Sequence, residues 1–164
     1  MSTTKPRAAV EKSLKIGQAC ACFNLRRATR AVTQLYDDAL RSVGLRTTQF
    51  TLLNAIRVMG PVTVRRLATV VVMDRTTLTR DLRPLERQGL VLVAPGEDRR
   101  ERKVDLTVKG IQVIRRALPL WEKAQAQVAK GLGEERLQRL LGDLSAAVAL
   151  TRAGKKHAEL MKEN

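Results

Sequence analysis

The side chains best suited to chemistry in this chain are the threonines and arginines of residues 75–83, and that chemistry is recognition of a nucleic acid. They lie opposite the apolar stripe of a predicted helix, and no glutamate lies on their face before Glu86. Threonine near a helix start can contact base edges and thymine methyl groups, and arginine can bind guanine or phosphate. An ordinary solvated face is the alternative. The predicted DNA-contacting residues of this helix are Arg75, Thr76, Thr77, Thr79, Arg80 and Arg83.

A second charged group follows at a predicted turn between two strands. Basic side chains at the tip of such a hairpin can enter a narrow, electronegative minor groove. An aspartate beside them can hold one arginine in place by a charge-assisted pair. A soluble loop with incidental charge is the alternative. The predicted contact residues of the tip are Asp98, Arg99, Arg100 and Arg102.

Cys20 and Cys22 could carry thiol chemistry instead. They lie at the predicted start of a helix, with Arg26 one turn further on, and both features favour a thiolate. Two such positions on one continuous helix point about 200° apart and cannot form a disulfide. The single histidine, His157, lies far away in the sequence, so the pair makes a poor metal site and no cofactor is expected. Free cysteines buried in a helical core are the alternative.

The overall charge supports a polyanionic partner. The chain of 164 residues has 31 lysines and arginines against 16 acidic residues, a net charge of +15. Only four side chains are phenylalanine, tyrosine or tryptophan, which leaves little for single-stranded bases to stack on, so duplex DNA is favoured. No apolar run approaches the ~20 residues of a membrane span, and the N-terminus lacks the features of a secretory signal. We expect a cytoplasmic protein.

The apolar spacing predicts the elements that position these side chains. A first amphipathic helix runs from about Gln18 to Arg41, and a second, capped by Thr48, ends before Gly60. Thr63 is expected to cap a third, short helix. The fourth helix begins after an Asp74 cap, ends at Gly89 and should bend at Pro84.

The remaining elements are a hairpin and two long helices. Strands are predicted at 91–94 and 103–106, followed by a fifth helix that Thr107 caps and Pro119 interrupts, and by a sixth helix. The fold class is therefore mainly α with a small β-hairpin wing, a winged helix-turn-helix with N- and C-terminal dimerisation helices.

The helices at the two ends carry longer apolar stripes than a module of about ninety residues can cover, which predicts a homodimer. In the alternative, these helices fold back on their own module. The predicted division is a flexible arm at 1–16, a helical dimerisation region at 17–44 with 108–160, and a DNA-binding lobe at 45–107.

Three segments resemble the MarR family. They are Leu90-Val91, Asp98-Arg99-Arg100 and Val104-Asp105-Leu106-Thr107-Val108-Lys109-Gly110, and the likeness extends over roughly residues 18–150. The resemblance implies a dimeric winged-helix regulator that binds a palindromic operator. It also implies that the fourth helix reads the major groove, that Arg100 enters the minor groove, and that effectors bind between the dimerisation helices and the DNA-reading lobe.

The cysteine segment resembles part of the organic-hydroperoxide sensors of that family. The likeness rests on Cys22-Phe23, Leu25 and Arg30, and Tyr36 matches a tyrosine that hydrogen-bonds the reactive cysteine. Cys22 and Tyr36 are 14 helical residues apart, roughly 21 Å, so they could meet only across a dimer. The subgroup's second tyrosine is replaced by Thr47, and Arg26-Arg27 replace less charged residues.

These observations predict a dimeric, sequence-specific regulator of transcription on double-stranded DNA. We expect a repressor that responds to a small-molecule effector or to thiol oxidation. A sequence-indifferent architectural DNA-binding protein is the alternative. An enzyme such as a thiol peroxidase has only the cysteines in its favour, because the sequence shows neither a nucleophile–histidine pair nor a phosphate-binding loop, and we do not expect one.

Overall fold

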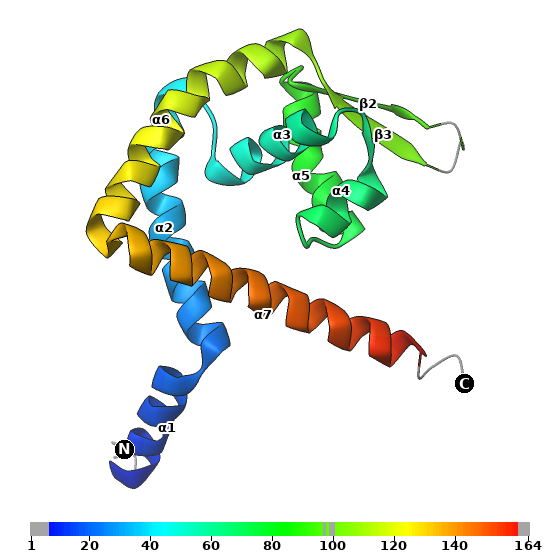
Figure 1. The fold of residues 1–164 in the computed structure, drawn as a ribbon. Helices are drawn as coiled ribbons and strands as arrows, with labels where there is room; N and C mark the ends of the chain where they lie inside the picture. Colours follow the sequence, from blue (N-terminus) through cyan, green and yellow to red (C-terminus); the bar gives the residue numbers. More distant parts are fainter. Residues whose placement is uncertain (1–6, 97, 99–100, 161–164) are drawn as a thin grey trace, which may run out of the picture. The chain divides into compact units, whose positions relative to one another are not determined.

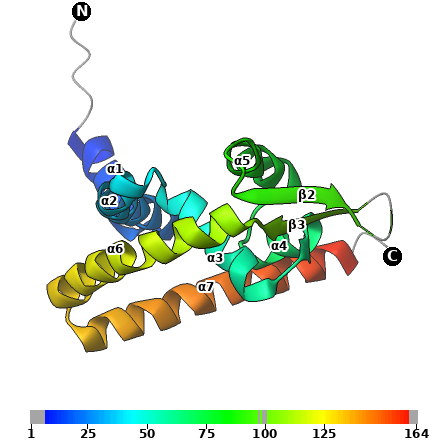
Figure 2. The ribbon, with the colours of Figure 1, turned by 90° about the horizontal axis from the view of Figure 1, so that it is seen from above.

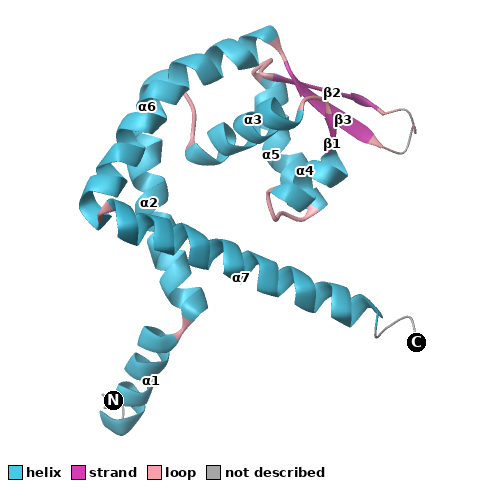
Figure 3. Cartoon of the chain, viewed as in Figure 1, coloured by secondary structure: helices cyan, strands magenta, loops and turns pink. Residues whose placement is uncertain are grey.

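The computed structural model describes residues 7–96, 98 and 101–160, which form mostly helices and one small sheet (Figures 1 and 3). Two compact units divide the chain at Trp121 and Glu122. The predicted fold class is confirmed in its helical content and its hairpin wing. In chain order the elements are α1 (Arg7–Ala19), α2 (Ala21–Leu40), the short 3-10 helix η1 (Arg41–Val43), α3 (Thr47–Met59), β1 (Val62–Thr63), α4 (Val64–Val70), α5 (Arg75–Arg87), β2 (Val91–Pro95), β3 (Arg102–Leu106), α6 (Val108–Leu132) and α7 (Glu134–Leu160).

The core of the first unit lies between α3, α4, α5, the sheet and the beginning of α6. Leu53, Leu67, Leu78, Val104 and Ile114 are fully buried in it, one from each of these elements. The leucines of α5 recur at three- and four-residue steps, so one side of that helix is packed and the other faces solvent. The core therefore fixes which face of α5 is presented outward.

The sheet is antiparallel with the strand order β1-β3-β2. In the β2–β3 hairpin Val91 lies opposite Leu106, and Pro95 lies opposite Arg102. Figures 1 and 2 show this hairpin projecting beyond α4 and α5. Strand β1, which pairs Val62 with Val104, was not predicted, because two residues are too few to show the alternation of a strand.

Local capping accounts for the starts of two helices. The Thr63 Oγ1 atom accepts a hydrogen bond from the backbone amide of Arg66 at 3.2 Å, so the predicted cap of α4 is confirmed. The predicted Thr48 cap is wrong, because α3 begins at Thr47 and its N-cap is Arg46, two residues earlier than predicted. There the amide of Thr47 donates to Asp37 at 2.6 Å, and the amide of Arg46 donates to the Gln49 side chain at 2.9 Å.

The two prolines do not end their helices. Pro119 lies inside α6, which runs without interruption from Val108 to Leu132, so the predicted break is wrong. Proline removes one backbone hydrogen bond. Here the carbonyl that loses its partner belongs to the exposed Arg115, where water can replace it. Pro84 likewise lies within α5, and the bend expected there stays a prediction.

The N-terminal segment differs from the predicted arm at residues 1–16. Arg7–Ala19 is helical, in keeping with its alanine, lysine and leucine content. The helix expected from about Gln18 is therefore divided. Cys20 has an extended backbone (φ −75°, ψ 109°) and separates α1 from α2. The flexibility of the segment stays a prediction.

The second unit contains the end of α6 and all of α7. Gly133, with φ of 84°, forms the turn between them, a conformation that side chains other than glycine rarely adopt. Several large apolar side chains of α7 are at least a third exposed: Leu140, Leu141, Leu144, Val148 and Leu150. Of the helices that the structure describes, none is both long and apolar enough to span a membrane.

Candidate nucleic-acid interface

Helix α5 presents a basic face to solvent. Leu78, Leu82 and Leu85 are buried, and at 100° per residue the opposite side of the helix carries a threonine followed by arginines. All four of these side chains are exposed: Thr76, Arg80, Arg83 and Arg87. Three of the six predicted contact residues of α5, Thr76, Arg80 and Arg83, lie on this face, and none of the six is buried.

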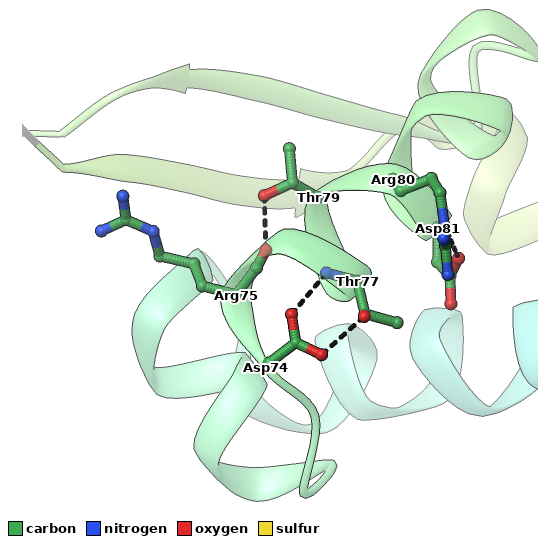
Figure 4. A network of polar contacts seen from close by, with 6 residues as sticks. All are labelled: Asp74, Arg75, Thr77, Thr79, Arg80 and Asp81. Carbon is green, nitrogen blue, oxygen red and sulfur yellow. Dashed lines mark hydrogen bonds and ion pairs between the residues drawn. The ribbon is translucent and has the colours of Figure 1, made fainter.

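The start of α5 is fixed by a local network around Asp74 (Figure 4). The amide of Thr77 donates to Asp74 Oδ1 at 2.8 Å, and the Thr77 hydroxyl donates to Oδ2 at 2.5 Å. These bonds lower the pKa of the Asp74 carboxyl, with the side-chain hydroxyl as the largest cause. The predicted Asp74 cap is confirmed. The Thr77 hydroxyl, which we expected to face DNA, is engaged in that cap.

Figure 4 also shows Arg75, Thr79 and Arg80 of α5. Arg75 extends away from the helix, and the Thr79 hydroxyl donates to the Arg75 carbonyl at 2.7 Å. The Arg80 Nε atom lies 3.7 Å from Asp81, and the Arg80 side chain remains 74% exposed. So weak and exposed a pair leaves Arg80 able to exchange its partner for a base or a phosphate.

A hollow of about 670 Å³ separates α5 from the hairpin. Arg75, Thr79 and Arg83 line it from α5, and Arg102 lines it from β3. Arg65 of α4 also lines the hollow and was not predicted as a contact residue. The exposed pair Arg65-Arg66 was the available signal, but only the packing of α4 against α5 shows that one member faces this hollow.

The hairpin tip is described in part. Asp98 is exposed, and the Asp98 carbonyl accepts from the Glu101 amide at 2.9 Å, which closes the turn. Arg102 is exposed and reaches the Val93 carbonyl at 3.5 Å. The other two predicted tip residues, Arg99 and Arg100, lie outside the described residues. Glu101 and Asp98 also line the hollow from the hairpin side, and Glu86 lines it from α5, so acidic groups lie on both sides of it.

Comparison with known proteins identifies the family. The model of the MarR family matches residues 45–101. An HTH-type transcriptional regulator of Bacillus cereus is 30% identical over 126 residues, which are 77% of this chain and 84% of that protein. The chain belongs to the MarR family. This confirms the predicted family.

Two further relatives bear on this MarR-family chain. The solved structure of the transcriptional regulator MosR of M. tuberculosis in complex with DNA has a TM-score of 0.72 and 41% sequence identity, and it covers 81% of this chain and 98% of that one. The HTH-type regulator YwoH of Bacillus subtilis is 30% identical over 83 residues, 51% of this chain. That second match spans 61% of YwoH.

The C-terminal end of α5 is attached to the beginning of α6 in this MarR-family fold. The Thr107 hydroxyl donates to the Gly89 carbonyl at 2.6 Å and accepts from the amide of Gly110 at 3.0 Å. Lys109 Nζ donates to the Gln88 carbonyl at 2.8 Å. A Cβ atom at Gly110 would lie 2.1 Å from the Leu90 carbonyl oxygen, so only glycine fits. We call residues 88–90 with 107–110 the α5–α6 junction.

The cysteines lie at the start of α2. The Cys20 sulfur accepts a hydrogen bond from the Phe23 amide at 3.4 Å and caps α2, whereas Cys22 is exposed in the first turn. Because Cys20 is outside the helix, the argument that two helical positions cannot bridge does not apply to this pair. Cys22 does not lie in the core of this chain, contrary to the alternative of buried free cysteines. No group of three or more histidine, cysteine or acidic side chains in the described part of the chain could hold a metal ion.

Tyr36, the third residue of the predicted sensor, lies further along α2. It is buried against Trp121, with ring centroids 6.4 Å apart. Burial raises the pKa of its phenol. Since Cys22 and Tyr36 both belong to α2, the length of the helix separates them within one chain.

Proposed function

We propose that this chain is a sequence-specific regulator of transcription that binds double-stranded DNA as a homodimer and acts as a repressor. The observation that carries the proposal is the exposed Thr76–Arg80–Arg83–Arg87 face of α5, which the buried leucines on the opposite side hold outward. A 13-residue helix with a threonine start and an arginine flank fits the major groove. The hairpin beside it would place its basic residues on the neighbouring backbone or minor groove.

The relationship to MosR supports the same function, since MosR is a transcriptional regulator with a structure in complex with DNA. The cytoplasm is the compartment in which such a protein would meet the chromosome. We place the DNA-binding lobe at residues 45–107.

The function is tested by selecting binding sites from random duplex DNA and mapping the selected site by footprinting against excess competitor. We expect one protected site with two half-sites about one helical turn apart, ~34 Å between centres. Protection without sequence preference would favour the architectural alternative. Transcription from a promoter overlapping the site should fall when the protein is added and should not rise.

For the dimer we propose that residues 17–44 and 108–160 form the interface. Exposed apolar side chains in these two segments support the proposed interface. In α2, Phe23, Leu25 and Val32 are each more than 40% exposed, and so are Leu140 and Leu141 of α7. Sedimentation equilibrium tests this directly. A monomer at concentrations where the protein protects its site would exclude the proposed arrangement.

We propose that DNA binding is regulated either by oxidation of Cys22 or by an effector bound at the C-terminal half of α2. The exposure of Cys22 supports the first route. A hollow of about 690 Å³ between α2 and the segment that precedes α3, lined by Arg30, Asp37 and Arg46 among others, supports the second. Tyr36 could meet Cys22 only from the other chain of the dimer.

The oxidation route predicts that an organic hydroperoxide releases wild-type protein from its site and that Cys22→Ser does not respond. Cys20→Ser, which removes the other thiol, serves as the matched variant in the same mobility-shift assay. Peroxide-induced release that survives in Cys22→Ser would exclude Cys22 as the sensor and leave the effector route.

A further inference from the structure

The three threonines in the first turns of α5 differ in what their hydroxyl groups can still do. Each hydroxyl has one hydrogen to donate and lone pairs that can accept. The Thr77 hydrogen is given to Asp74 at 2.5 Å, and the Thr79 hydrogen is given to the Arg75 carbonyl at 2.7 Å. Thr76 has no such bond within the described part of the chain.

Their positions on the helix differ as well. Thr77 is half-buried and faces the Asp74 carboxylate, so its side chain is a part of the cap. Thr79 is exposed and lines the hollow with Arg75 and Arg83. Figure 4 shows the Thr79 oxygen directed at the Arg75 carbonyl and the methyl group pointing away from it. Threonine adopts this rotamer in helices because the hydroxyl can bond a carbonyl one turn back.

We propose that Thr79 is a specificity-determining residue that reads one base as a hydrogen-bond acceptor only. Its hydrogen is already committed within the helix, while its side chain is exposed and its oxygen keeps lone pairs that can accept. In the major groove the groups that can donate to it are the N6 amino group of adenine and the N4 amino group of cytosine. The O4 of thymine and the O6 of guanine are acceptors, and Thr79 could serve them only by giving up its bond to Arg75. This inference rests on the proposed function.

The test measures the affinity of wild type, Thr79→Val and Thr79→Ser for every single base-pair variant of the selected site. Valine keeps the shape of threonine and removes the oxygen, whereas serine keeps the oxygen and removes the methyl group. We expect Thr79→Val to lose its preference at one base pair of each half-site and to bind the best site about fivefold more weakly. Thr79→Ser should keep the wild-type preference at that position.

A base analogue tests the same bond from the DNA side. If the base is adenine, purine replaces it; if it is cytosine, 2-pyrimidinone replaces it, and each analogue lacks the amino group. Wild type should bind the analogue about fivefold more weakly. Thr79→Val should bind both duplexes equally, because it has no oxygen to lose a partner.

The matched control is Thr69→Val on α4, where the hydroxyl makes the same type of bond, to the Arg65 carbonyl at 3.2 Å. It should leave every base preference unchanged, and melting followed by circular dichroism verifies that both valine variants fold. An unchanged base pattern in Thr79→Val overturns the inference. A base preference that is lost in Thr79→Ser but kept in Thr79→Val also overturns the inference, because it would show that the methyl group recognises the base. If wild type selects no sequence at all, the proposed function itself fails, and the two failures are thus distinguishable.

Discussion

At the scale of single residues, the arginines of α5 divide according to where the helix places them. Arg80 lies on the outer face beyond the threonines, whereas Arg83 lies closer to the hollow and lines it. Removing a side chain that contacts a base edge changes the base preference at one position of the site. Removing a side chain that contacts phosphate lowers the affinity for all sequences alike.

We therefore predict different consequences for two alanine variants. Arg83→Ala should weaken binding to selected and random duplexes by the same factor and reduce the slope of log K against log salt by about 1. Arg80→Ala should relax the preference at one base pair by about 1–3 kcal/mol. Titrations of both DNAs at several salt concentrations measure these effects. Equal behaviour of the two variants would contradict the assignment.

Asp74 gives a prediction about pH. Hydrogen bonds from Thr77 lower the pKa of the folded-state carboxyl. A lowered pKa means that the stabilisation is present above the pKa of the unfolded chain and is lost as the pH falls through the folded-state value. Asp74→Asn keeps an acceptor but does not titrate.

Wild type should therefore melt at a higher temperature than Asp74→Asn at about pH 7, and the difference should shrink as the pH falls towards about 3. Melting curves at a series of pH values check this. Asp143→Asn is a suitable comparison, because Asp143 is an exposed carboxyl of α7 outside any helix start. A constant difference between wild type and Asp74→Asn at all pH values would show that the ionised cap contributes nothing.

At the scale of elements, the α5–α6 junction depends on the absence of a side chain at residue 110. We predict that Gly110→Ala destabilises the fold by about 1–3 kcal/mol, because the new methyl group would overlap the Leu90 carbonyl oxygen. Gly131→Ala, in the same helix with nothing within 4 Å of the added atom, should instead be neutral or stabilising by up to about 1 kcal/mol. Denaturant unfolding measures both. A neutral Gly110→Ala would mean that the junction yields easily.

The elements that sequence predicted well are those whose signals are local. Asp74 and Thr63 cap helices through amides only three residues away, so the residue types alone indicate the boundaries. Thr48 failed as a cap because contacts from Asp37, ten residues earlier, set the start of α3. The exposed face of α5 followed from its leucine spacing.

The parts that could not be predicted depend on tertiary packing. The separation of α1 from α2 at Cys20 has no glycine or proline at residues 18–22 to mark it. The position of Arg65 in the hollow depends on how α4 packs against α5, and helical periodicity carries no information about that. The break predicted at Pro119 was wrong, because a helix tolerates proline where water can bind the carbonyl that loses its partner, here that of Arg115.

At the scale of the whole molecule, the net charge of +15 acts on stability as well as on DNA binding. Basic residues occupy the faces of α4 and α5 and the hairpin, so like charges are concentrated in the proposed DNA-binding lobe. Without DNA this repulsion opposes folding, and salt screens it.

We predict that the melting temperature of the free protein rises by a few degrees between about 0.1 and 1 M sodium chloride, as the Debye length falls from about 10 to 3 Å. Affinity for duplex DNA should fall over the same range. Sodium chloride is preferable to sulfate, which stabilises proteins by exclusion from their surface. A melting temperature that falls with salt would mean that attractive ion pairs outweigh the repulsion.

The α5–α6 junction also has a mechanical consequence. It holds α5 at its C-terminal end, whereas Thr76 and Thr79 lie towards the other end, about 18 and 13 Å from residue 88 along the helix. Any rotation of α5 would therefore be centred on the α5–α6 junction, residues 88–90 and 107–110. A rotation of only about 5° at the junction displaces the far end by about 1.5 Å, which is enough to break a hydrogen bond to a base. Because Leu78 packs the far end of α5 into the core of the lobe, the lobe would turn together with α5. A signal that tilts the first turn of α6 slightly would therefore displace the threonines from their bases.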